Sequence, residues 1–350
     1  MKRTGKVFRH TLFKLAALSI GLFFVYLFIR GSDLSAIGFH LGRVGFKFFI
    51  LTLVTAMTQV LATAAWRLTF PEPPIAIPFW SMVFIRLIGE NVAIVNPTNI
   101  IAGEATKAYL LKKRGIPYAD GIASLTLSRF LIFITGFSLI LFGVTFCALR
   151  RRSFLLPLII LGGIFLPLIS LVIVRYRKNK PFISNALDSL VRRWRKVPQT
   201  PHWVASVQRL ENKLLALKSE QPGRLLAALV LSFLQWMPGA VEFFLILQFL
   251  GISASFISVV AVESGVQFFR TIGAFIPGQL GAEEYGNRLM LGVVVGGGSV
   301  WLAASILRRS RQLFWLGVSI ILSLFYFGKL GRKKVFLAKK FPVENLPLLP

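Results

Sequence analysis

The stretch that decides the fold reads Phe84-Ile85-Arg86-Leu87-Ile88-Gly89-Glu90-Asn91, and Asn96-Pro97-Thr98-Asn99 follows it closely. Both interruptions fall inside the apolar segment Phe79–Ile101, which is long enough to enter a bilayer. A helix broken at membrane depth is tolerated only where protein or a watery cavity surrounds the break. A full crossing would also place the basic residues that follow, from Lys107 onward, outside the cell, against the positive-inside rule. The sequence therefore predicts a re-entrant hairpin that dips into the membrane and returns to the cytoplasm.

The composition of the whole chain supports a membrane protein. Of its 350 residues, 55% are apolar and only 15% are charged, against roughly 25% in soluble domains. The charges are uneven, with 41 Lys and Arg against 13 Asp and Glu, but the basic residues lie between apolar runs. That arrangement is typical of a polytopic membrane protein and argues against nucleic-acid binding. A single cysteine, Cys147, and three scattered histidines indicate no metal site, and we expect no cofactor.

Nine apolar segments follow one another along the chain. They are Leu12–Ile29, Phe46–Trp66, Phe79–Ile101, Ile122–Leu149, Phe154–Val174, Leu225–Leu250, Phe256–Ile276, Leu289–Leu307 and Leu313–Phe327. We interpret the first as a retained anchor with a cytoplasmic N-terminus, because basic residues precede it and no small-residue cleavage site follows. The expected fold is an all-α, multi-pass protein of the cell membrane with seven to nine transmembrane segments.

Residues 1–350 are expected to form one integral membrane domain. Its polar insert, residues 175–224, carries twelve Lys and Arg against three acidic residues, which places it in the cytoplasm. The insert is either a solvated linker or an amphipathic helix lying on anionic headgroups. A basic tail, residues 329–350, also favours the cytoplasm. Arg308, Arg309 and Arg311 separate the last two apolar segments and compete with the tail for that side, so the side of the C-terminus stays open.

An internal repeat links the broken segment to a second one. Phe268-Phe269-Arg270-Thr271-Ile272-Gly273 resembles residues 84–89, and in each copy a proline is followed by a glutamate seven residues later. These pairs are Pro97 with Glu104 and Pro277 with Glu284, and the expected helix breaks are Pro97, Gly103, Pro277 and Gly281. Because an odd number of expected spans separates the copies, the second would enter from the opposite face. The sequence thus predicts an inverted repeat of two broken helices, as in many transporters.

Charged residues at membrane depth are expensive, so they need partners or water. One interpretation is structural: Arg86 and Glu90 neutralise each other, and Glu263 serves Arg270 or Arg129. The other is functional: a polar cavity whose arginines bind a phosphate with bidentate hydrogen bonds. The candidate substrate-binding residues are Arg86, Glu90, Asn91, Glu104, Lys107, Arg129, Glu263, Arg270, Glu283 and Glu284. Glu242 also lies within an apolar segment.

Two motifs carry a resemblance to a known family. The sequence resembles both signatures of the flippase-like, lysylphosphatidylglycerol-synthase transmembrane family. The first is matched by Asn96-Pro97 with Gly103-Glu104-Ala105-Thr106-Lys107, and the second by Ile276-Pro277-Gly278-Gln279-Leu280-Gly281-Ala282-Glu283-Glu284. The resemblance implies a membrane domain with re-entrant helices that moves lipids between leaflets, and it assigns Glu104, Lys107 and Glu284 to the motifs. Residues 98–102 are less glycine-rich than in relatives, and Glu283 replaces arginine or an apolar residue. Because the chain stops at Pro350, we expect no soluble transferase domain.

Three functions remain open from the sequence. The first is translocation of an anionic phospholipid or a polyprenyl-linked lipid. The second is a membrane enzyme acting on a lipid phosphate, which the absence of a recognisable catalytic motif makes the weaker hypothesis. The third is an accessory partner that recruits a synthase through residues 182–197. Whether the protein forms a homo-oligomer or binds a synthase partner stays open. The sequence indicates neither the lipid nor the direction of transport.

Overall fold

The computed structural model describes residues 44–70, 77–95, 100–163, 221–273, 281–296 and 300–340, with a few single residues between these ranges. Within this part of the chain every regular element is a helix and there is no strand. The expected all-α fold of a polytopic membrane protein is thereby confirmed. The first apolar segment, Leu12–Ile29, and nearly all of the insert at 175–224 lie outside the described residues.

Three stretches of the described chain are helices long and apolar enough to cross a membrane. They are α3 (Lys47–Arg67), α6 (Tyr118–Arg150) and the pair α10 (Pro222–Leu234) with α11 (Met237–Phe249). At 1.5 Å per residue, the 33 residues of α6 span about 50 Å, more than the roughly 30 Å hydrocarbon core. The segment Leu225–Leu250, expected as one span, is two helices joined by a turn at Gln235 and Trp236.

These helices expose apolar side chains as a lipid-facing helix does. On α3, Leu53 and Met57 are exposed, while Leu51, Thr55 and Trp66 are buried. In water such a face would be unfavourable, but hydrocarbon solvates it as well as a protein core does. The opposite face of α3 carries the polar groups that meet the rest of the protein, including Thr55, which accepts a hydrogen bond from Trp315 Nε1 at 2.9 Å.

The first copy of the repeat forms a helical hairpin of α4 (Phe79–Val95) and α5 (Ile100–Lys113). Contrary to expectation, α4 continues without a break through Gly89, Glu90 and Asn91, and the expected break at Gly103 is wrong because α5 runs through it. Pro97 lies outside the described residues. Gly89 and Gly103 explain how closely the two helices approach. A Cβ added at Gly103 would lie 2.7 Å from the carbonyl oxygen of Gly89, so only glycine fits there.

The second copy pairs α12 (Phe256–Ile272) with α13 (Ala282–Val294). Close contact again depends on glycine, because a Cβ added at Gly273, at the end of α12, would lie 2.4 Å from Ala282 Cβ at the start of α13. Gly281, an expected helix break, precedes α13 with a φ of 82°, a conformation that favours glycine. Pro277, the other expected break of this copy, lies outside the described residues.

The last helix, α14 (Val300–Lys340), corrects the expected segmentation. The boundary inferred at Arg308, Arg309 and Arg311 is wrong, because α14 runs through these residues without interruption and buries Arg308 and Arg309. Residues 289–294 of the preceding segment belong to α13 instead. The helix also continues through residues 329–340 of the expected basic tail.

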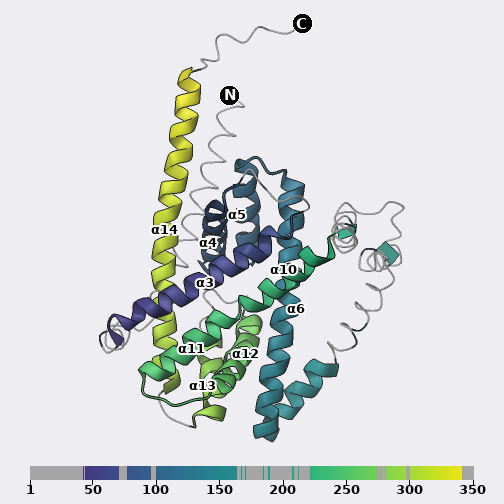
Figure 1. Cartoon of the computed structure of the whole chain (residues 1–350), viewed down its shortest axis with the longest axis vertical. Helices are drawn as coiled ribbons and strands as arrows, with labels where there is room; N and C mark the ends of the chain where they lie inside the picture. Colours follow the sequence, from purple (N-terminus) through teal and green to yellow (C-terminus); the bar gives the residue numbers. More distant parts are fainter. Residues whose placement is uncertain are drawn as a thin grey trace, which may run out of the picture.

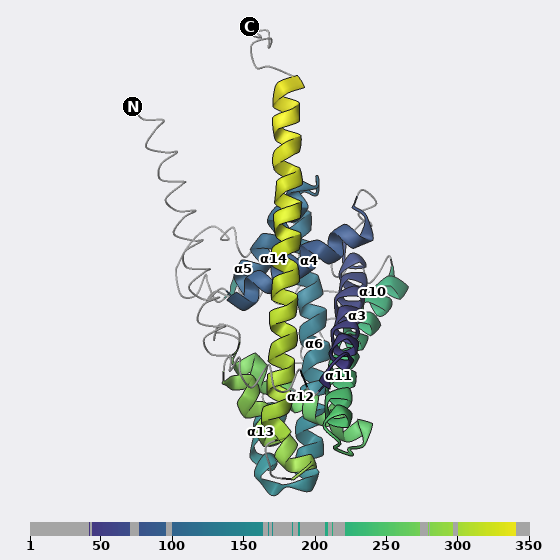
Figure 2. The same ribbon diagram turned by 90° about the vertical axis from the view of Figure 1, so that its left-hand side faces the viewer.

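The two hairpins lie at two levels of the molecule, and α6 and α14 run past both. Figure 1 shows α4 and α5 at one level and α12 and α13 at the other, with α3 running obliquely beside α10 and α11, and Figure 2 shows the same two levels from the side. Helix α6 packs on both α5 and α12, and α14 packs on both α4 and α13. This arrangement brings the charged residues of both repeat copies toward the middle of the protein.

Candidate functional site

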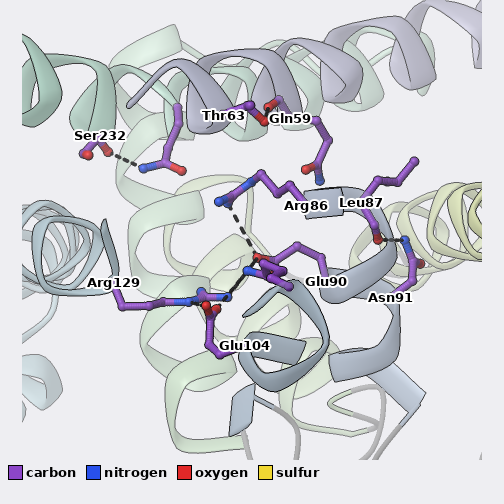
Figure 3. Close-up of polar contacts among 11 residues, drawn as sticks. Gln59, Thr63, Arg86, Leu87, Glu90, Asn91, Glu104, Arg129 and Ser232 are labelled. Atoms are coloured by element: carbon purple, nitrogen blue, oxygen red, sulfur yellow. Dashed lines mark hydrogen bonds and ion pairs between the residues drawn. The ribbon is translucent and has the colours of Figure 1, made fainter. Parts of the chain in front are cut away.

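The first ion cluster joins the α4–α5 hairpin to α6, and its members are Arg86, Glu90, Glu104, Lys107 and Arg129. Lys107 Nζ lies 2.8 Å from both Glu90 Oε1 and Glu104 Oε1. Arg129 binds the same two carboxylates from α6, and Arg86 Nη2 lies 3.7 Å from Glu90 Oε1 (Figure 3). Three cations thus surround two carboxylates, and the cluster carries one positive charge in excess.

This cluster is held by the hairpin packing itself. A Cβ added at Gly89 would meet Lys107 Cγ at 2.5 Å, so the aliphatic part of the lysine lies directly on the glycine. The lysine is buried by this contact and extends its ammonium group toward Glu90 and Glu104. Because Gly89 has no side chain, Lys107 can lie against α4, and its buried ammonium group reaches Glu90 on α4 and Glu104 on α5. The glycine lowers the helix propensity of α4 in return.

The second ion cluster joins α11, α12, α13 and α14. Its members are Glu242, Glu263, Arg270, Glu283, Glu284, Arg308, Arg309 and Arg311. Glu263 binds two arginines: Arg270, seven residues further along α12, and Arg308 of α14, whose Nη1 lies 2.8 Å from Glu263 Oε2. Four cations balance four carboxylates here, so this cluster is neutral as a whole.

The remaining contacts of the second cluster fix α13 and α11 against α14. Glu283 lies 3.4 Å from Arg308 Nε through Oε1 and accepts a 3.0 Å hydrogen bond from Gln312 Nε2 through Oε2. Glu284 pairs with Arg309 and also accepts a hydrogen bond from the Gly281 backbone, which caps the start of α13. Each carboxylate is therefore engaged by α14, and α13 cannot shift along α14 without breaking these contacts.

A cavity of about 250 Å³ borders both clusters. It is lined by side chains from α3, α4, α12 and α14 and from the turn before α13, including Gln59, Glu90, Asn91, Arg270, Gln279 and Arg311. Two guanidinium groups from different helices therefore face one cavity together with a carboxylate and several amides. The backbone of Gln279, one of the lining residues, has a φ of 53°, which is uncommon for a residue other than glycine.

The predicted substrate-binding residues are divided between the cavity wall and its surroundings. Glu90, Asn91 and Arg270 line the cavity, whereas Arg86 is not among the lining residues and contacts one of them, Glu90, at 3.7 Å. The others, Glu104, Lys107, Arg129, Glu263, Glu283 and Glu284, occupy the two ion clusters. Of the two partners considered for Glu263, the structure gives Arg270, and Arg129 binds Glu90 and Glu104 instead.

Sequence reasoning missed four members of the second cluster, namely Glu242, Arg308, Arg309 and Arg311, as site residues. The missed signal is charge balance at membrane depth. Six glutamates lie in or beside apolar segments, but only four cations, three arginines and Lys107, were recognised there. The two carboxylates left over would be very costly in hydrocarbon, and the arginines of α14 supply the missing cations.

Residues 14–327 match the family model for the lysylphosphatidylglycerol synthase TM region. The matched range contains both hairpins, both ion clusters and every residue that lines the cavity. No curated protein and no solved structure matches the chain.

Proposed function

The chain belongs to the family of the lysylphosphatidylglycerol synthase TM region, and we propose from this premise that its cavity binds the phosphate headgroup of an anionic lipid. We further propose that the protein moves this lipid between the two leaflets. Membership of the family makes it a membrane protein related to lipid handling. The observation that carries the finer proposal is the meeting of Arg270 and Arg311 at one cavity.

Two arginines are well suited to a lipid phosphate. A guanidinium presents a planar fork of N–H donors that matches the oxygens of a phosphate, and it stays charged even when partly buried. Arg270 and Arg311 come from α12 and α14 and each also has a carboxylate partner, Glu263 and Glu242 respectively. These carboxylates neutralise the two arginines in the membrane interior, and a bound phosphate would then accept hydrogen bonds from the same two arginines.

The size of the cavity favours a headgroup over a whole lipid. About 250 Å³ would hold roughly eight waters at about 30 Å³ each, and it falls below the roughly 300–1,000 Å³ of sites for drug-sized ligands. A phosphate with a small substituent fits this space, whereas acyl chains do not. We infer that the headgroup enters the protein while the chains remain in the surrounding hydrocarbon, next to exposed apolar faces such as that of α3.

The hairpins supply the part of the protein that would let a headgroup cross. Helix α4, with 17 residues, is about 25 Å long and α5, with 14, about 21 Å, both shorter than the roughly 30 Å core. These lengths favour a re-entrant hairpin over two crossings, and α12 with α13 offers a second hairpin of similar length. We propose that the cavity between the two hairpins opens alternately to each leaflet, as in transporters built from inverted repeats.

We favour transport over catalysis because the carboxylates near the cavity are occupied. Glu90, Glu242 and Glu263 each form an ion pair with an arginine or a lysine. A general base needs a free carboxylate within reach of the proton it removes. Release of phosphate or headgroup by the purified protein would contradict this choice.

The proposal can be tested in vesicles that contain the purified protein and a fluorescent phosphatidylglycerol. Transbilayer movement is measured by the accessibility of the label to a membrane-impermeant quencher. The informative variant is the double substitution E242Q/R311Q, which removes one of the two cavity arginines without leaving a buried carboxylate unpaired. We expect it to reduce the rate of movement at least tenfold while the protein stays folded.

A matched control replaces another buried polar contact between helices of the same region. Asn287 Nδ2 donates to Ser305 Oγ at 2.9 Å between α13 and α14, away from the cavity lining. The variant N287L/S305A should therefore retain movement close to that of the wild type. Wild-type protein that moves anionic lipid no faster than empty vesicles would overturn the proposed function.

A further inference from the structure

A second cavity, of about 340 Å³, lies at the end of the molecule where α6 and α13 finish and α14 begins (Figure 2). Its lining combines apolar side chains of α13 and α14 with two arginines, a tryptophan and two glycines, namely Arg151, Arg288, Trp301, Gly292 and Gly296. None of these residues lines the central cavity that borders the two ion clusters. The protein therefore has a separate peripheral pocket beside the second hairpin.

The two arginines of the peripheral pocket lack an acidic partner. No ion pair between described residues includes Arg151 or Arg288, and none of the described residues that line the pocket is acidic. Every arginine of the two ion clusters, in contrast, contacts a carboxylate. The peripheral pocket is thus a site of two uncompensated positive charges.

Most hydrogen-bond donors of these two arginines are available to a ligand. Arg151 Nη2 donates to the Gly292 carbonyl oxygen at 3.1 Å, which holds the guanidinium group against α13. The guanidinium carbon of Arg288 lies 5.8 Å from the centre of the Trp301 ring, a contact that uses none of the N–H donors. Because each guanidinium group has five N–H donors, the pocket can supply several hydrogen bonds to one anion.

The peripheral pocket lies at the depth of the lipid headgroups. Helix α6 is about 50 Å long and exceeds the roughly 30 Å hydrocarbon core, so its end at Arg150 and Arg151 reaches the interface. Trp301 is a residue type enriched at that level. Basic residues also precede the other end of α6, at residues 112–114, and the positive-inside rule accounts for only one of the two ends.

We propose that the peripheral pocket holds the phosphate headgroup of an anionic lipid as a resident ligand, separate from any lipid in the central cavity. The phosphate oxygens accept hydrogen bonds from both Arg151 and Arg288, and the lipid thereby joins the end of α6 to α13 of the second hairpin. A volume of about 340 Å³ equals that of roughly eleven waters, enough for a phosphate with a small substituent. A zwitterionic headgroup is disfavoured, because its ammonium group would meet two arginines and no carboxylate.

Gly292 provides a position for a reporter, because it lines the pocket and a Cβ added there meets nothing within 4 Å. The thiol of full-length G292C is reacted with a water-soluble maleimide in a neutral detergent, and wild-type protein, whose Cys147 is buried, gives the background. The added probes are dioctanoyl phosphatidylglycerol and dioctanoyl phosphatidylcholine. At about ten times its dissociation constant, phosphatidylglycerol should slow the reaction about tenfold, since only the unoccupied protein reacts. Phosphatidylcholine at the same concentration should change the rate less than twofold.

Two double variants in the G292C background separate the arginines of the pocket from general charge. R151Q/R288Q should abolish the protection, and because both side chains are exposed we expect the variant to stay folded. R150Q/R152Q removes the same charge at the end of α6, but neither of its residues lines the pocket, so it should keep the protection. The comparison of the two lipids on G292C alone decides the question even if R151Q/R288Q does not fold.

Two further variants exclude other causes of protection. G223C places a thiol at an open position of α10, away from the peripheral pocket, and its reaction rate should not depend on which lipid is added. E242Q/R311Q in the G292C background alters the central cavity alone and should keep the protection. The peripheral site is therefore tested independently of the proposed transport.

Three results would overturn the inference. Equal protection of G292C by the two lipids would show that the pocket does not select an anionic headgroup. Equal protection by inorganic phosphate at the same concentration would make the ligand a soluble anion and not a lipid. Absence of protection by phosphatidylglycerol would remove the site altogether, while the proposed function of the central cavity would stand.

Discussion

Arg311 of α14 pairs with Glu242 of α11, with Arg311 Nε 2.9 Å from Glu242 Oε1, and the same arginine borders the central cavity. Glu242 is completely buried, whereas Arg311 is partly accessible from the cavity. The buried carboxylate thus holds a cation at the cavity wall, and the pair links the stability of the helix bundle to the properties of the site.

Removing one member of this pair should be far more harmful than removing both. R311L leaves the Glu242 carboxylate buried without its closest cation, and such a change destabilises proteins by about 3–5 kcal/mol. The double variant E242L/R311L replaces the pair with apolar groups and should unfold near the wild-type temperature or above it. Thermal unfolding of both variants in detergent measures the difference. Equal destabilisation by the two would show that the pair does not act as a unit.

The contact between α4 and α5 should not tolerate any side chain at its glycines. In G103A the new methyl group would lie 2.7 Å from the Gly89 carbonyl oxygen and 2.9 Å from Ala93 Cβ, so the helices must separate. We expect a loss of about 1–3 kcal/mol, as for other overpacked interiors. G292A is the matched control, because a Cβ at this position within α13 meets nothing within 4 Å. The control should gain about 0.5–1 kcal/mol from the better helix propensity of alanine.

Much of the fold follows from local signals in the sequence. Long apolar runs indicate α3, α6 and the α10–α11 pair, and the repeated arginine–glycine pattern marks the regions in which the two helix pairs, α4 with α5 and α12 with α13, are found. The interruption at Gly89 was misread, because a glycine beside charged residues looks the same in sequence whether it breaks a helix or packs against another one. Only the partner, Gly103 on α5, distinguishes the two cases.

The second ion cluster was harder to predict because three arginines in four positions between apolar runs are typical of a cytoplasmic loop. The positive-inside rule treats such residues one segment at a time. Their burial depends instead on Glu242, Glu263 and Glu283, which come from three other helices. Charge neutrality at membrane depth is a property of the whole helix bundle, so a local sequence pattern does not show which residues of other helices neutralise a given charge.

Gln279 should respond in opposite ways to two substitutions. Its φ of 53° is unfavourable for most side chains by about 1–2 kcal/mol and worse for β-branched ones. Q279G relieves this strain but makes the unfolded chain more flexible, so its stability should stay within about 1 kcal/mol of the wild type. Q279V keeps the strain and adds crowding, and it should lower the unfolding temperature. A valine variant as stable as the glycine variant would contradict a left-handed backbone at this position.

The first ion cluster should depend more on Arg129 than on Arg86. Arg129 binds both Glu90 and Glu104 and connects the hairpin to α6, whereas Arg86 contacts Glu90 alone, at 3.7 Å. R129M removes contacts to two carboxylates and leaves a neutral cluster held by Lys107 on the hairpin itself, so α6 loses its ionic link to α5. R86M leaves the same total charge but keeps that link. We therefore expect both variants to carry an electrically neutral cluster and only R129M to be clearly destabilised, by about 1.5–3 kcal/mol, because it loses hydrogen bonds to two charged groups. Chemical unfolding of the two variants in the same detergent measures this contrast. A larger loss in R86M would mean that the hairpin is held by burial of Arg86 and not by its ionic connection to α6.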